Sequence, residues 1–196
     1  MRLEDGGSYH DELIDGLTLA ERVLRSVELE DVTFVGCRFA QVKLLSCQLT
    51  ACTFKDCDLS ALDLTGSTLN GVRFEQCRLM GIDFASALQV LVDLGFQGCQ
   101  LDYSCFARMD LGRTRFVDCR MRDVDFSSAQ LERAVFKGSD LKGVNFNRAV
   151  LIRADLRGAA NVSFDPKLVS LNQTRVDLDA LLAIGAQLGL KTDMAR

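Results

Sequence analysis

The stretch MRDVDFSSAQLERAVFKGSDLKGVNFNRAVL, residues 121–151, repeats one pattern every five residues. A large apolar residue recurs at Met121, Phe126, Leu131, Phe136, Leu141, Phe146 and Leu151. A small or β-branched residue stands two places before each of them, and most other positions are polar. An α-helix repeats every ~3.6 residues and a strand every two, so neither explains this period. Each five-residue unit is expected to bury two side chains and to expose three.

The pattern extends outward over most of the chain. Large apolar residues stand five apart from Leu24 to Phe84, and the spacing resumes at Leu91 and runs to Leu156. A longer period appears in a ladder of aromatic residues that are 20 apart except for one step of 22: Phe34, Phe54, Phe74, Phe96, Phe116 and Phe136. Four units therefore form one coil, and one coil contains a two-residue insertion between Phe84 and Leu91.

Coils of equal length predict a solenoid whose coils stack at β-sheet spacing, about 4.8 Å. Parallel stacking with crossover connections favours a right-handed path. The predicted fold is an all-β solenoid, a right-handed quadrilateral parallel β-helix, followed by a C-terminal α-helix. We expect an acidic N-terminal segment at residues 1–16, the β-helix at residues 17–163, and the C-terminal helix and tail at residues 164–196.

The tail has the features of a short helix. Asp177 is a suitable N-cap and Gly189 a suitable residue after the helix end. Between them, apolar residues follow helical spacing at Leu178, Leu181, Leu182 and Leu188. An apolar helix after a solenoid can cover the open end of the coil or pair with a second copy.

Charge is unevenly placed along the chain. Residues 1–31 contain nine acidic and three basic residues, whereas residues 32–196 contain 18 acidic and 20 basic residues. No apolar run approaches the ~18 residues of a membrane span, and no export signal is recognised near the N-terminus. The sequence therefore predicts a cytoplasmic protein with no membrane partner and with reduced cysteines.

The eight cysteines are expected to be structural. Seven occupy the small inward position, at multiples of five residues except for the 22-residue step across the insertion, which is typical of packing rather than of a metal site. Cys105 stands one place before a large residue, so it is expected to face outward as the one candidate for a reactive thiol.

The single histidine, His10, lies in the predicted N-terminal segment. No phosphate-binding or serine-nucleophile motif is present, so we expect no catalytic residue, metal, cofactor or small-molecule substrate.

The units CDLSA (57–61) and SDLKG (139–143) resemble the pentapeptide-repeat family over roughly residues 17–163. The endings FDPK (164–167) and RVDLDALLAIGAQLGL (175–190) resemble its Qnr quinolone-resistance and topoisomerase-poison self-immunity members. This resemblance implies a DNA mimic that engages DNA gyrase or topoisomerase IV. It also implies a homodimer through the C-terminal helix, with Leu178, Leu181, Leu182 and Leu188 at the contact. Many Qnr proteins carry projecting loops of about ten residues, whereas this chain has only the two-residue insertion.

Two columns of like charge are expected on the surface. Asp63, Asp83 and Asp125 form an acidic column that could imitate phosphates and bind the partner. Arg113, Arg133 and Arg153 form a basic edge that could bind an acidic partner or nucleic acid. Of these two, we do not expect direct binding of nucleic acid. Residues 32–163 contain 14 acidic and 16 basic residues. A generic interaction scaffold with no link to topoisomerases therefore remains the alternative. In that case both charged columns are ordinary solvent-exposed surface.

Overall fold

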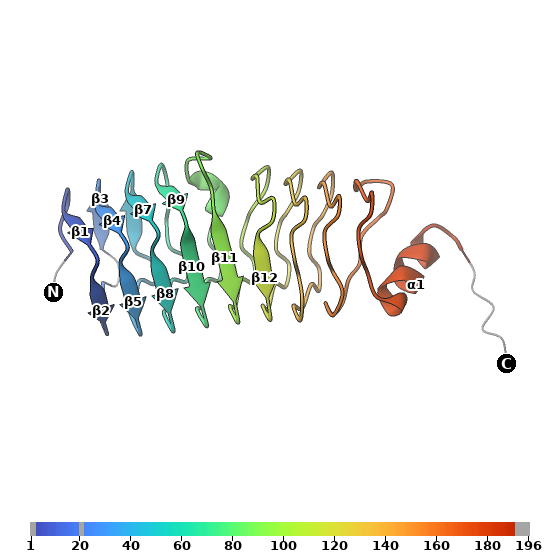
Figure 1. Ribbon diagram of the computed structural model, residues 1–196, viewed down its shortest axis with the longest axis horizontal. Helices are drawn as coiled ribbons and strands as arrows, with labels where there is room; N and C mark the ends of the chain where they lie inside the picture. The colour runs from blue at the N-terminus through green and yellow to red at the C-terminus, as the bar shows by residue number, and fades with distance from the viewer. Residues whose placement is uncertain (1–2, 20–21, 191–196) are drawn as a thin grey trace.

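The computed structural model describes residues 3–19 and 22–190 of the chain. Stacked coils form an elongated rod, and a single α-helix, α1 (Leu178–Gln187), follows at the C-terminal end (Figure 1). All strand pairs are parallel. The predicted fold class, a right-handed quadrilateral parallel β-helix with a C-terminal helix, is confirmed.

Short strands line the sides of the rod: β1 (Ser8–His10), β2 (Leu13–Asp15), β3 (Val23–Arg25), β4 (Glu28–Glu30), β5 (Thr33–Val35), β6 (Lys43–Leu45), β7 (Gln48–Thr50), β8 (Thr53–Lys55), β9 (Thr68–Asn70), β10 (Val72–Glu75), β11 (Leu94–Gln97) and β12 (Arg115–Val117). One side is the sheet β2-β5-β8-β10-β11-β12, which we call the long-sheet face. A second side is the sheet β1-β4-β7-β9, and a third contains the pair β3-β6. Beyond β12, isolated parallel bridges continue the ladders.

The strand register confirms the predicted coil length and the size of the insertion. Phe34 pairs with Phe54, and Phe54 pairs with Phe74, at the 20-residue period. Phe74 pairs with Phe96, 22 residues on. Phe96 then pairs with Phe116, so the regular period resumes immediately.

The first coil begins earlier than the sequence predicted. β1 pairs with β4 and β2 pairs with β5, so residues from Ser8 onward already belong to the rod. Tyr9 and Ile14 continue the five-residue spacing back from Leu19, and Ile14 is 4% exposed. The predicted boundary at residue 17 is therefore wrong, because the partly buried Tyr9 and the buried Ile14 already pack as inward residues of the first coil.

The last coil also runs further than predicted. Bridges Val150↔Ser170 and Asp155↔Arg175 carry the stacked path past the expected end at residue 163. Helix α1 starts at the predicted N-cap, Asp177, but this side chain does not cap the helix. Its Oδ2 instead accepts a hydrogen bond from the backbone N–H of Gly158, 2.6 Å away, and so ties the helix start to the coil. Residues 191–196 of the predicted tail lie outside the described residues.

The insertion displaces one predicted inward residue. A 3-10 helix, η1 (Phe84–Ser86), precedes a loop in which Leu91 has a positive φ of 52° and is 76% exposed. Large buried residues resume at Leu94 and Phe96. The expectation that Leu91 restarts the inward series is therefore wrong. The two extra residues bulge outward here, and the half-buried Val92 packs against the core nearby.

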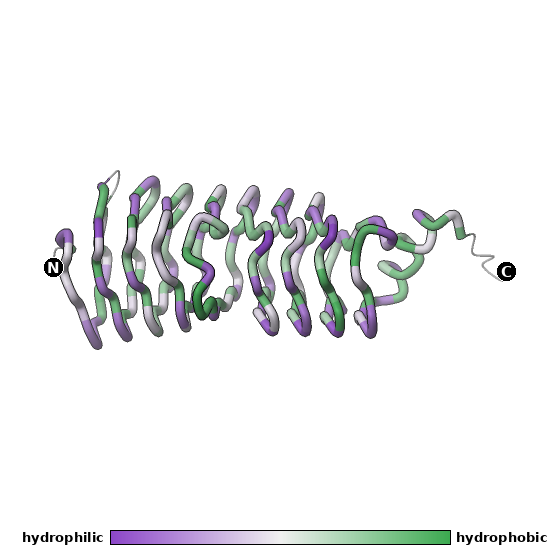
Figure 2. Tube along the Cα trace, turned by 90° about the horizontal axis from the view of Figure 1, so that it is seen from above, coloured by the Kyte–Doolittle hydropathy of each residue, from purple (hydrophilic) through white to green (hydrophobic). Residues whose placement is uncertain are grey.

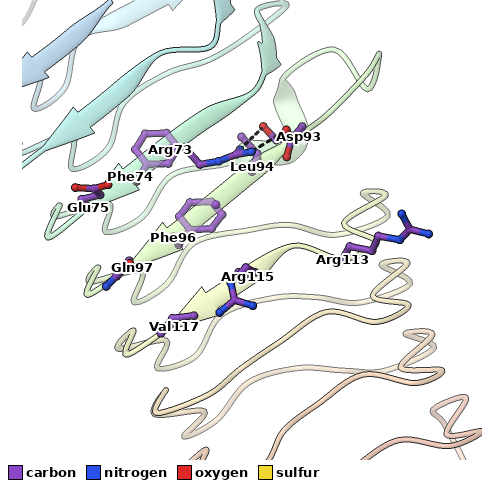
Figure 3. Close-up of a pocket in the computed structure, with 11 residues that line it drawn as sticks. Arg73, Phe74, Glu75, Asp93, Leu94, Phe96, Gln97, Arg113, Arg115 and Val117 are labelled. Carbon is purple, nitrogen blue, oxygen red and sulfur yellow. Dashed lines mark hydrogen bonds and ion pairs between the residues drawn. The ribbon is translucent and has the colours of Figure 1, made fainter.

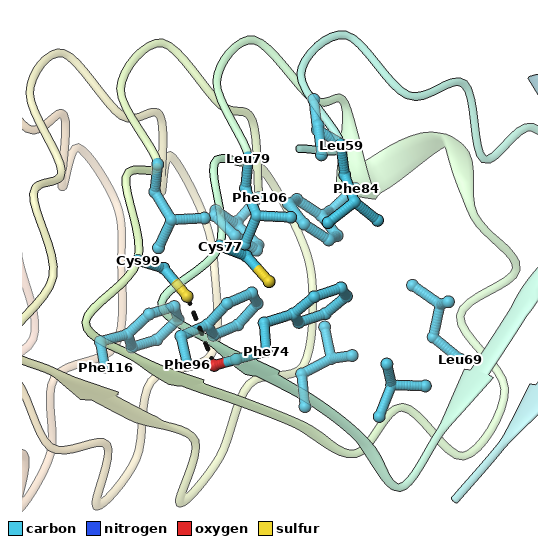
Figure 4. Close-up of a cluster of buried hydrophobic side chains, with 14 of the residues drawn as sticks. Leu59, Leu69, Phe74, Cys77, Leu79, Phe84, Phe96, Cys99, Phe106 and Phe116 are labelled. Atoms are coloured by element: carbon cyan, nitrogen blue, oxygen red, sulfur yellow. Dashed lines mark hydrogen bonds between the residues drawn. The ribbon is translucent and has the colours of Figure 1, made fainter. Parts of the chain in front are cut away.

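Stacked phenylalanine rings fill the interior (Figure 4). Phe116 lies between Phe96 and Phe136, with ring centroids 5.0 Å and 5.1 Å apart and planes within 8° of parallel. A second stack, which includes Phe106 and Phe126, meets the first edge to face: the Phe106 and Phe116 rings cross at 79° with centroids 5.7 Å apart. Both geometries are favourable for aromatic pairs. The rod is therefore held together by contacts between neighbouring coils.

Candidate interaction surfaces

The predicted acidic residues lie in one column of the coil. Bridges join Asp83 to Cys105, Cys105 to Asp125, and Asp125 to Asn145. Lys43 and Asp63 are bridged in the coils before them. Asp83 is exposed, whereas Asp63 and Asp125 are half-buried. Asp63, Asp83 and Asp125 therefore share a side of the rod, but they do not present equal carboxylate surface.

Each carboxylate in this column also accepts a hydrogen bond from the turn that directly follows it. Oδ1 of Asp83 accepts a hydrogen bond from the backbone N–H of Ala85 at 3.0 Å, and Oδ1 of Asp125 accepts one from Ser127 at 2.8 Å. Asp63 accepts from both the backbone N–H and the hydroxyl of Thr65, at 3.0 Å and 2.6 Å. The expectation that these side chains only point outward is therefore incomplete. Aspartate and asparagine side chains commonly hydrogen-bond the backbone two residues further on, and these aspartates were present in the sequence as a signal for such turns.

An amide can replace the carboxylate in this turn. Asn145 occupies the next place in the same column, and its Oδ1 accepts a hydrogen bond from the backbone N–H of Asn147 at 3.0 Å. Aspartate-to-asparagine changes in the column are therefore expected to remove charge and to keep the turn.

The turn hydrogen bonds favour the ionised carboxylate. The hydroxyl of Thr65 holds the pKa of Asp63 below its ordinary value. Hydrogen bonding from the Arg157 guanidinium similarly lowers the pKa of Asp155. A depressed pKa adds stability that is fully present above the unfolded pKa and is lost as the pH falls through the folded pKa. These groups therefore stabilise the rod at neutral pH and stop doing so in acid.

We expect the urea midpoint of unfolding to fall as the pH is lowered from 6 to about 3, because the unfolded pKa of these aspartates lies near 3.8. The urea midpoint of the variant Asp63→Asn/Asp155→Asn should fall by less over the same pH range. An equal or higher midpoint at pH 3 for the unaltered protein would contradict the assignment.

Cys105 is half-buried between two carboxylates. Burial raises the pKa of its thiol, and the charges of Asp83 and Asp125 raise it further. The thiolate is the reactive form of cysteine, so this environment disfavours a strong nucleophile at neutral pH. Cys105 does face outward as predicted, but it is poorly activated.

The other seven cysteines are buried. Their thiols donate hydrogen bonds to backbone carbonyls, as from Sγ of Cys99 to the oxygen of Phe74 at 3.3 Å (Figure 4). Burial raises the pKa of Cys52 to about 11. No group of three His, Cys, Asp or Glu residues within 3–19 and 22–190 is arranged to hold a metal ion.

Native thiol labelling should therefore be selective and slow. We expect Cys105 to react first of the eight cysteines, at a rate that increases as the pH approaches and passes 9, the ordinary thiol pKa. Mass spectrometry of the modified peptides gives the order of reaction, and Cys105→Ser should abolish the first step. Early modification of Cys57 or Cys77 would show that the inward register is wrong.

Helix α1 leaves an apolar surface uncovered. Ile184 is 7% exposed and packs toward the coil, whereas Leu178, Leu181, Leu182 and Leu188 are 69%, 56%, 37% and 44% exposed. Figure 2 shows hydrophobic residues gathered in this terminal element. The four leucines predicted for a dimer contact are thus available to a second molecule. In the described part of the chain, no helix is long and apolar enough to cross a membrane.

Comparisons with known proteins identify the repeat. A family model described as a pentapeptide repeat region matches residues 27–95 and 90–164. Two structures of trypsin-treated QnrB1 variants, described as a plasmid-mediated fluoroquinolone resistance protein, have the same architecture. The first is 19% identical and covers 96% of this chain and 91% of that chain, with a TM-score of 0.77. The second is 20% identical and covers 95% of this chain and 100% of that chain, with a TM-score of 0.64.

No curated protein sequence is significantly similar to this chain. At 19–20% identity, the likeness to QnrB1 shows the fold alone. The two matched ranges together span residues 27–164, and they meet at the coil that carries the insertion. The matched ranges, the five-residue inward pattern and the parallel coils agree over most of the sequence, and the chain belongs to the pentapeptide-repeat family.

Proposed function

We propose that this protein is a cytoplasmic, non-catalytic DNA mimic that binds a type II topoisomerase, DNA gyrase or topoisomerase IV. Binding would modulate the enzyme or protect it from poisons such as quinolones or peptide toxins. The main support is the match in architecture to QnrB1 over 96% of the chain, at a TM-score of 0.77. QnrB1 is described as a fluoroquinolone resistance protein.

The distribution of charge suggests which part of the rod would imitate DNA. Residues 1–107 contain 16 acidic and 8 basic residues. Asp63 and Asp83 lie in this half, and Asp125 lies just beyond it. A surface that binds DNA is basic, and it attracts an acidic rod by the same electrostatic complementarity. The acidic half is therefore the favoured contact surface.

Dimerisation would place two acidic halves at opposite ends of one particle. An isologous contact buries the same patch on both copies, and the exposed leucines of α1 offer such a patch at the C-terminal end. Pairing through Leu178, Leu181, Leu182 and Leu188 would give a rod twice as long, with its acidic parts outermost.

A generic interaction scaffold is the second candidate. It is favoured by the near balance of charge in the rod, since residues 32–163 contain 14 acidic and 16 basic residues. A mimic that relies on uniform negative charge would need a larger acidic excess.

A supercoiling assay with purified gyrase tests the proposal. Addition of the protein at micromolar concentration should inhibit or alter supercoiling, and the effect should weaken as salt rises because exposed charges are screened. No effect on either gyrase or topoisomerase IV would remove the topoisomerase proposal and leave the scaffold.

A charge-matched pair of variants tests the contact face. Asp63→Asn/Asp83→Asn/Asp125→Asn should weaken the effect on gyrase. The control is Asp58→Asn/Asp110→Asn/Asp155→Asn, which removes the same charge from equivalent turn-holding positions on other sides of the rod. If both variants act like the unaltered protein, this column is not the contact surface.

A further inference from the structure

Cationic side chains gather on one face in the C-terminal half of the rod. Bridges Arg115↔Val135, Val135↔Asp155 and Asp155↔Arg175 continue the long-sheet face beyond β12. We use the name basic face for the cationic residues on this side and at its leading corner: Arg113, Arg115, Arg133, Lys137, Arg153, Arg157 and Arg175. All of them are exposed, and they come from successive stacked coils.

The charge on the basic face is only partly neutralised. Arg157 lies 2.7 Å from a carboxylate oxygen of Asp155, and Arg133 lies 3.8 Å from one of Glu132. Five members form no ion pair with any residue in 3–19 or 22–190: Arg113, Arg115, Lys137, Arg153 and Arg175. Like charges stacked on neighbouring strands repel each other, so the stacking of arginines in one column does not by itself stabilise the rod.

Backbone conformation gives a second, independent observation. Arg113, Arg133 and Arg153 stand at corners with φ of 65°, 61° and 58°. Glycine, asparagine and aspartate tolerate this left-handed region best. The same corner carries Asp11, Asp31, Ala51 and Gly71 in the first four coils, at φ of 53°, 54°, 53° and 69°. Arginine therefore occupies this corner only in the C-terminal half of the rod, where it places three like charges in one column.

The surroundings of the basic face favour a phosphate backbone over a protein partner. The anchor residues of protein interfaces are enriched in tryptophan and tyrosine as well as arginine, and no exposed aromatic side chain lies among the described residues of this face. Val117 and Val135 are half-buried between the cations. Guanidinium groups bind phosphate oxygens in bidentate fashion. A regular array of them along the rod suits a polymer of phosphates.

The N-terminal margin of this face is a shallow depression (Figure 3). Gly95 lines it and pairs with Arg73 on one neighbouring strand and with Arg115 on the other. A Cβ on Gly95 would lie 2.9 Å from Cδ of Arg73, so glycine lets this arginine lie across the strand toward Asp93, with 2.8 Å between the charged groups. Arg113 and Arg115 project from the next coil without such a partner. The guanidinium groups that have no acidic partner therefore start at the N-terminal margin of the basic face.

We propose that the basic face binds the phosphodiester backbone of nucleic acid without reading its bases. Residues 108–196 contain 15 basic and 11 acidic residues, so the rod is acidic at one end and basic at the other. This function goes beyond topoisomerase binding, and it replaces the sequence-based expectation that the chain does not bind nucleic acid. The flat face carries no exposed aromatic group for base stacking, so binding depends on charge.

Fluorescence anisotropy with a labelled 20-base-pair DNA duplex, in the absence of any topoisomerase, tests this proposal. We expect binding at about 50 mM salt that weakens linearly with the logarithm of salt concentration. Arg113→Gln/Arg133→Gln/Arg153→Gln should bind at least ~10-fold more weakly, with a salt slope smaller by about one unit per arginine. Gln173 occupies the next corner of this column at φ of 60°, so glutamine fits the backbone there.

The matched control is Arg25→Gln/Arg38→Gln/Arg78→Gln, which removes three exposed charges from other sides of the rod and should bind DNA like the unaltered protein. No duplex binding at micromolar protein, or an equal loss in both variants, would overturn the proposal. Tight binding of poly-glutamate without duplex binding would assign the basic face to an acidic protein instead. Because the assay contains no topoisomerase, its outcome is separate from that of the supercoiling assay.

Discussion

Replacement of Phe116 by alanine is expected to lower the free energy of unfolding by about 3–5 kcal/mol. The Phe116 ring is fully buried, stacks on Phe96 and Phe136, and meets Phe106 and Phe126 edge to face. Its neighbours are fixed by the backbone ladders of adjacent coils, so they cannot close the resulting cavity. Urea denaturation followed by circular dichroism measures the change.

Phe164→Ala is the matched control for this result. Phe164 is 7% exposed, and its one ring contact is with Phe146, at 5.9 Å between centroids. Its loss should therefore cost clearly less than that of Phe116. A cost below about 1 kcal/mol for Phe116→Ala would show that the interior stack does not carry the stability assigned to it.

Leu181→Glu/Leu182→Glu is expected to convert a dimer to a monomer. In an isologous contact each substitution occurs twice, so four carboxylates would be buried in an apolar patch without partners, which is strongly unfavourable. Light scattering should give twice the chain mass for the unaltered protein and the chain mass for the variant.

Leu88→Glu provides the control, because Leu88 is 49% exposed in the insertion loop, far along the chain from α1. This variant should retain the mass of the unaltered protein. If the unaltered protein is itself monomeric, α1 serves only to cover the end of the coil, and the dimer proposal is wrong.

The repeat could be predicted from the sequence because its period matches the physical period of the coil. The ladder from Phe34 to Phe136 places each ring directly on the next, and it fixes the size of the insertion through the step from Phe74 to Phe96. A single mismatched residue could not alter this result, because every coil repeats the same information.

The ends and the insertion could not be predicted as well, because there the inward positions accept other residues. Tyr9 and Ile14 extend the first coil, although neither is leucine or phenylalanine. Leu91 has the expected type and spacing but lies outside, because the extra residues change the direction of the chain before Leu94. Periodicity alone does not show where a bulge absorbs inserted residues.

The surface was less predictable than the core. Spacing placed Asp63, Asp83 and Asp125 in one column, but it did not show that each holds a turn. Spacing also placed Arg113, Arg133 and Arg153 on one edge. Only the structure joins this edge to Arg115 and Arg175 on the long-sheet face.

Size-exclusion chromatography with light scattering, on a mixture of the protein and purified gyrase without DNA, tests the topoisomerase proposal most directly. Omission of DNA removes any bridging through the basic face. We predict that at micromolar concentrations and low salt the two proteins elute as one complex, and that this complex dissociates as salt rises. Separate elution of gyrase and the pentapeptide-repeat protein under these conditions would contradict the proposal.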